Sequence, residues 1–133
     1  MKSYTDLEQS RKLAEILPIE SADMAWCNNS IKGINYTDKY SANLYTVKEM
    51  KDAFDKALVG WDKYWELIPC WSLAALLYVI PERIIKNYYA PNLQKENGKY
   101  SIAYGDDELL CIADNPVDAC VAMIEKLNEL NLL

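Results

Sequence analysis

Nucleophiles and proton carriers do the chemistry of most enzymes, and this chain offers few of them. It contains no histidine, which excludes Ser-His-Asp and Cys-His catalysis, His-Glu-x-x-His metal sites and proton transfer by imidazole. Neither a Walker A loop nor a G-x-G-x-x-G loop occurs, and four glycines are too few to favour a phosphate-binding loop. The sequence therefore predicts no catalytic residue and no cofactor, and the motifs argue against an enzyme.

Four cysteines are the remaining candidate nucleophiles: Cys27, Cys70, Cys111 and Cys120. Cys111 falls in an expected strand and Cys120 on the apolar face of an expected helix, where burial raises a thiol pKa and lowers its reactivity. Four thiolates on a zinc ion are an alternative, but separations of 43, 41 and 9 residues match no zinc knuckle. We interpret the cysteines as free, mostly buried thiols and predict no metal site.

The acidic residues are concentrated near the end of the chain. The net charge of the chain is −6, and the segment from Asp106 to Glu129 carries a charge of −6 by itself. Its acidic turn, Asp106-Asp107-Glu108, lacks the ligand spacing of a calcium loop. Because no basic stripe exists, direct binding to nucleic acid lacks its main driving force. Carboxylates on one contiguous face would instead suit an acidic decoy of a nucleic-acid-binding site.

Aromatic content is out of proportion, with ten tyrosines and four tryptophans against a single phenylalanine. Phenylalanine would meet a requirement for packing alone, whereas Tyr and Trp combine an apolar body with a polar tip and suit interfaces. Two interpretations stay open: the tryptophans close the core and the tyrosines cover its rim, or these residues form a partner-binding surface. The candidate interface residues are Trp61, Tyr64, Trp65, Tyr36, Tyr40 and Tyr45.

Four helices are expected to position these residues. Capping boxes predict helix starts at Thr5–Glu8 and at Thr46–Glu49. A third helix is predicted over Pro69–Ile80, and because it has almost no polar face we expect it at the centre, with Leu76 and Leu77 both buried. The fourth is predicted from Asn115 as cap, with proline in its first turn.

Strand signals are fewer and shorter. A short strand is expected at Met24–Cys27, and Asn97-Gly98 is a strong signal for a hairpin. The sequence predicts an α+β fold, with a small antiparallel sheet of three to four strands and a β-meander at about 88–113, packed against about four helices. We expect a single globular domain over 1–133, with an irregular or inserted segment at about 28–66.

The longest nearly apolar run, Ile68–Ile80, would extend only about 20 Å as a helix. Bilayer hydrocarbon is about 30 Å thick, so a buried helix is expected instead of a membrane span. The first residues contain no apolar stretch of the kind that forms a signal peptide. We therefore predict a cytoplasmic protein that does not bind membranes.

Three blocks carry a resemblance: Asp6–Trp26, Ile68–Leu77 with its Pro-x-Trp-Ser-Leu-x-Ala-Leu-Leu string, and Asp114–Leu127. Together they resemble a group of short, uncharacterised proteins encoded by bacteriophages and prophage-like mobile elements of gut bacteria. The resemblance implies a phage or mobile-element origin, and it implies no activity and no site residue. The segment from Ser30 to Glu66 has no counterpart in it.

These observations lead to a functional expectation. The favoured hypothesis is a non-enzymatic accessory protein that acts by protein–protein contacts, as a homo-oligomer or with an unidentified protein partner. The alternative is the acidic decoy, and the second alternative is an enzyme with an unrecognised site.

Overall fold

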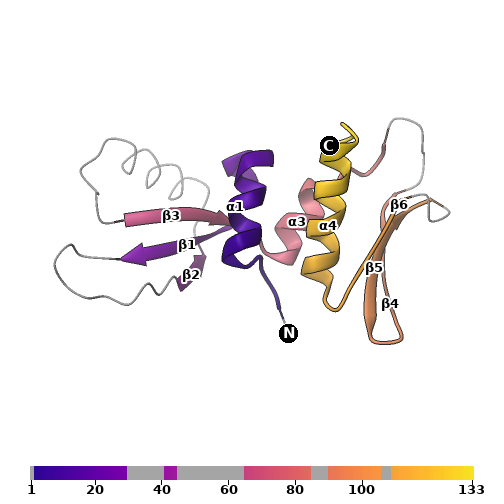
Figure 1. Ribbon diagram of the computed structural model, residues 1–133, viewed down its shortest axis with the longest axis horizontal. Helices are drawn as coiled ribbons and strands as arrows, with labels where there is room; N and C mark the ends of the chain where they lie inside the picture. The colour runs from indigo at the N-terminus through magenta and orange to yellow at the C-terminus, as the bar shows by residue number, and fades with distance from the viewer. Residues whose placement is uncertain (1, 30–40, 45–64, 85–89, 106–108) are drawn as a thin grey trace. The chain divides into compact units, whose positions relative to one another are not determined.

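The computed structural model describes residues 2–29, 41–44, 65–84, 90–105 and 109–133. By its internal contacts the chain divides into two units, Asp6–Trp71 and a second one that combines Met1–Thr5 with Ser72–Leu133. We call them the inserted unit and the terminal unit. Both contain helix and antiparallel sheet (Figure 1), which confirms the predicted α+β class. The single domain over 1–133 stays a prediction.

The inserted unit is a small sheet with a helix against it. Its elements are α1 (Leu7–Ile16), a 3-10 turn at Ile19–Ser21, β1 (Met24–Asn29), β2 (Ser41–Leu44) and β3 (Trp65–Cys70). β1 is the central strand and pairs antiparallel with both neighbours. α1 contacts β3. The buried apolar side chains described in the inserted unit are Leu13, Leu17, Ala22, Ala25, Ile68, Cys70 and Trp71.

Helix α1 does begin with a capping box, but the box lies one residue later than predicted. Asp6 Oδ1 accepts a hydrogen bond from the Gln9 backbone N–H at 2.8 Å, and Gln9 Oε1 accepts one from the Asp6 N–H at 3.1 Å. The predicted pair, Thr5 and Glu8, was wrong because α1 begins at Leu7 with Asp6 as its N-cap, and Thr5 is fully buried one residue earlier. A carboxylate at the cap also interacts favourably with the helix dipole.

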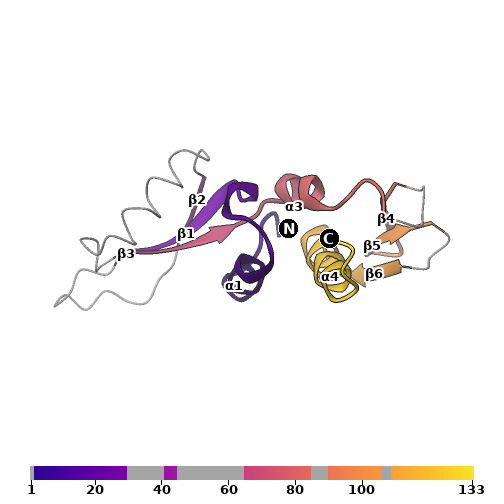
Figure 2. The same ribbon diagram turned by 90° about the horizontal axis from the view of Figure 1, so that it is seen from above.

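The terminal unit packs two helices and a second sheet. Its elements are α3 (Leu73–Val79), β4 (Asn92–Glu96), β5 (Lys99–Tyr104), β6 (Leu109–Ala113) and α4 (Pro116–Glu129). The strands pair antiparallel in chain order, and α4 lies against β5, β6 and α3 (Figures 1 and 2). The buried apolar side chains of this unit include Ala75, Leu76, Ile80, Ile102, Tyr104, Val117, Ala119, Cys120, Val121, Met123, Ile124 and Leu127, which we call the core around α4.

Two local predictions in this unit are confirmed. Asn97 and Gly98 join β4 to β5 with φ values of 51° and 75°, the left-handed conformation that this turn requires. Asn115 caps α4, where its Oδ1 accepts from the Asp118 backbone N–H at 2.9 Å, and Pro116 occupies the first turn.

The helix predicted over Pro69–Ile80 was wrong in its first part. Residues up to Cys70 belong to β3, where Pro69 lies opposite Ala25 of β1. Helix α3 begins only at Leu73, after Ser72, whose Oγ accepts from the Ala75 N–H at 3.2 Å. An apolar run is compatible with a strand or a helix, and pairing with β1 decides in favour of the strand.

One three-stranded antiparallel sheet, β4-β5-β6, lies within the region predicted to form a sheet, but a second three-stranded sheet, β2-β1-β3, was not predicted. Strand β2 lies within the segment at about 28–66 that was expected to be irregular or inserted.

The described residues contain three α-helices, and the helix predicted from Thr46 lies outside them. None of the helices in the described part of the chain is both long and apolar enough to cross a bilayer.

Candidate functional site

Most of the aromatic residues predicted to form an interface lie outside the described part of the chain. These are Tyr36, Tyr40, Tyr45, Trp61 and Tyr64. Trp65 is the first residue of β3, and its side chain is likewise outside the description. The interface formed by these six residues therefore stays a prediction.

The three cysteines whose side chains the structure describes are buried or half-buried. Cys70 and Cys120 are buried, and Cys111 is half-buried on β6. Burial raises the pKa of the Cys120 thiol to about 11. Burial also raises the pKa of Cys111, an effect that the charge of Lys126 partly opposes. These three cysteines are outside any disulfide, and raised pKa values keep Cys111 and Cys120 in the less reactive thiol form at neutral pH.

A thiol-reactive dye is therefore expected to label Cys70 and Cys120 slowly in the native protein. In denaturant, all four cysteines of the chain should be labelled rapidly, because unfolding exposes every thiol. The measurement is the time course of labelling, with the modified cysteines identified by peptide mass spectrometry. Rapid native labelling of Cys120 would contradict its burial in α4.

The acidic residues near the chain end are partly neutralised. Asp114 forms an ion pair with Lys99 across the sheet. The Asp118 carboxylate accepts hydrogen bonds from Lys2 Nζ and Asn115 Nδ2, each at 2.7 Å. Within the described residues, no three His, Cys, Asp or Glu side chains lie close enough together to hold a metal ion.

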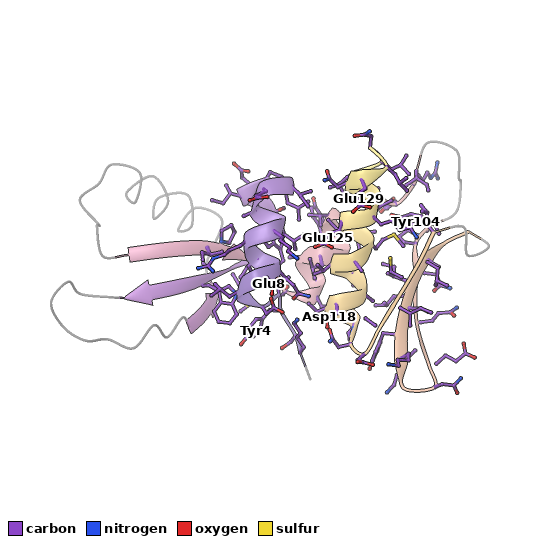
Figure 3. The ribbon with its side chains drawn as sticks, in the orientation of Figure 1. Tyr4, Glu8, Tyr104, Asp118, Glu125 and Glu129 are labelled. Carbon is purple, nitrogen blue, oxygen red and sulfur yellow. The ribbon has the colours of Figure 1, made fainter. Side chains whose placement is uncertain are left out.

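Three carboxylates nevertheless share one face of α4. Asp118, Glu125 and Glu129 are seven and four residues apart, spacings that return to the same side of a helix. Figure 3 shows them in order along the helix. The acidic residues at 106–108, which the sequence predicts to form a turn, lie outside the described residues.

The sheet of the terminal unit has one covered face and one outer face. On β5, Ile102 and Tyr104 are buried on the side that α4 covers. Because side chains alternate along a strand, Ser101 and Ala103 lie on the other side. The register places Ile112 of β6 beside Ser101, and the Ile112 side chain is 60% exposed. Among the described residues of this outer sheet face, Ile112 is the strongly exposed large apolar one.

Helix α3 carries the larger exposed apolar surface. Tyr78 is 88% exposed and Leu77 41%, and Ala74 is exposed one turn earlier. Residues three and four apart are neighbours on a helix surface, so these three side chains form one contiguous area. We call it the α3 patch. The prediction that Leu77 is buried in a central helix was therefore wrong, because only one side of α3 packs against the core.

The terminal unit therefore presents an apolar helix patch, an outer sheet face and an acidic helix stripe. Comparisons with known proteins assign none of these to an activity: no family model, no curated protein and no solved structure matches the chain.

Proposed function

We propose that this protein is a non-enzymatic accessory protein that acts by protein–protein contacts, as a homo-oligomer or with a protein partner. The observation that carries the proposal is the α3 patch, where a tyrosine and a leucine are exposed together on an ordered helix. Tyrosine is enriched at interfaces and supplies a large contact area at a low cost in conformational entropy. The Tyr/Trp-rich segment predicted from the sequence supports the same class of function.

Replacement of both Leu77 and Tyr78 by serine should abolish self-association or partner capture and leave the fold intact. Neither side chain is fully buried in the terminal unit, so the cost in stability should be about 1 kcal/mol or less. The measurements are light scattering for the oligomeric mass and an affinity pull-down from the native host read by mass spectrometry. Circular dichroism provides the folding control.

A matched control is Ile112→Ser, which removes an exposed apolar side chain from the outer sheet face. It should retain mass and capture if the α3 patch is the interface. A folded Leu77→Ser/Tyr78→Ser variant with unchanged mass and capture would refute the α3 patch. The corresponding variant of Trp61 and Tyr64 then tests the interface predicted from the sequence.

The phage or mobile-element origin and the cytoplasmic location form part of this proposal, and both are supported only by the sequence. A second candidate is the acidic decoy, which the stripe of Asp118, Glu125 and Glu129 favours. The Asp118 carboxylate is already bound by Lys2, which weakens the stripe as a mimic of nucleic acid phosphates. We therefore prefer the proposal based on protein–protein contacts.

A further inference from the structure

The first residues of the chain fold with the terminal unit, although 66 residues separate them from Ser72 in the sequence. Tyr4 and Ser72 form an antiparallel bridge. The Ser3 carbonyl accepts a hydrogen bond from the Leu73 backbone N–H at 3.1 Å. That N–H belongs to the first turn of α3 and has no partner within the helix, so the N-terminal segment satisfies it.

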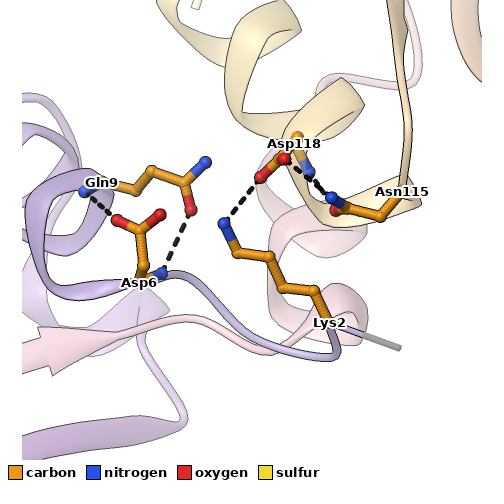
Figure 4. Close-up of polar contacts among 5 residues, drawn as sticks. All are labelled: Lys2, Asp6, Gln9, Asn115 and Asp118. Carbon is orange, nitrogen blue, oxygen red and sulfur yellow. Dashed lines mark hydrogen bonds and ion pairs between the residues drawn. The ribbon is translucent and has the colours of Figure 1, made fainter.

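An ion pair attaches the same segment to the second helix of the unit. Lys2 Nζ lies 2.7 Å from Asp118 Oδ1, and the two side chains are 26% and 36% exposed. Figure 4 shows the Asp118 carboxylate between Lys2 and Asn115, at the start of α4. Partial burial makes such a pair stronger than one on an open surface, because solvent screens it less.

We infer that residues 2–5 act as a strap, which joins the start of α3 to the start of α4. The chain leaves the terminal unit after Thr5 and returns at Ser72, and Cα atoms paired across an antiparallel bridge are about 4.5–5.5 Å apart. The strap therefore holds both ends of the Asp6–Trp71 segment together. The chain thus leaves the terminal unit and re-enters it at neighbouring residues, and release of the strap lets these two points separate.

Hydrogen exchange in the full-length chain, followed by NMR at single amides, tests the strap. Lys2→Glu places two like charges together and should accelerate exchange at Leu73 about tenfold, whereas Lys2→Gln should accelerate it about threefold. Lys2→Arg should leave the rate near that of the wild type. Amides in the middle of α1 should be unaffected, because release of the strap is a local opening.

The matched control is Lys12→Gln. Lys12 also pairs with a carboxylate, that of Glu8 at 3.6 Å, but these side chains are 60% and 82% exposed. This variant should not alter exchange at Leu73. Acceleration by Lys2→Glu that is confined to the first turn of α4 would overturn the inference, since the ion pair would then only cap that helix. An unchanged rate at Leu73, or equal acceleration at all amides, would overturn it as well.

Discussion

Replacement of Trp71 by alanine is expected to lower the free energy of unfolding by about 3–5 kcal/mol. The side chain is fully buried, and its indole Nε1–H donates a hydrogen bond to Ser21 Oγ at 2.9 Å. The substitution removes a large apolar volume and leaves a cavity that the surrounding structure fills only in part. A small domain has about 5–15 kcal/mol of stability in total, so the variant should be marginally folded. Urea denaturation followed by circular dichroism measures the loss.

Two variants separate the packing of Trp71 from its hydrogen bond. Ser21→Ala leaves the indole ring in place and removes the acceptor of its N–H, together with the hydrogen bond that the Ser21 hydroxyl donates to the Pro18 carbonyl at 2.6 Å. It should cost about 1–3 kcal/mol, the usual penalty for an unsatisfied polar group. Trp71→Phe keeps part of the apolar volume and should fall between the other two. If Trp71→Ala cost no more than Ser21→Ala, the proposed burial of the indole ring would be wrong.

Two neighbouring leucines of α3 are expected to respond very differently to truncation. Leu76 is fully buried and belongs to the core around α4, whereas Leu77 belongs to the exposed α3 patch. Leu76→Ala should therefore destabilise the protein by about 2–5 kcal/mol. Leu77→Ala should cost less than about 1 kcal/mol, because most substitutions outside a core have small effects. Both values follow from urea denaturation at one temperature.

The pair serves as its own control, because the two substitutions delete the same atoms from adjacent positions of one helix. Equal losses would mean that α3 is buried on both sides, as its nearly continuous apolar sequence first suggested. In that case the α3 patch would be part of the core, and the proposed function would lose its main support.

Local cues in the sequence determined several features of this protein. Asn97-Gly98 predicts its turn because left-handed backbone at both positions has a low cost for these residue types. Asn115 followed by proline predicts the start of α4, since the cap and the first turn need nothing beyond their own residues. Burial of Cys120 follows from the apolar face of the same helix. The turn and the cap depend on interactions within one or two turns of chain, whereas the apolar face identifies Cys120 as buried because other elements pack against that face.

Features that depend on distant partners were decided only by the tertiary structure. The apolar run after Trp65 suits a strand or a helix, and its pairing with β1, about forty residues earlier in the chain, makes its first part a strand. The choice of Asp6 over Thr5 as helix cap depends on burial of the preceding segment, which folds with residues beyond Ser72.

Residue type also fails to separate surface from core positions. Tyr104 is fully buried, with its hydroxyl donating to the Pro81 carbonyl, whereas Tyr78 is exposed. An amphipathic ring is stable in either environment, so the packing around it decides which one it occupies.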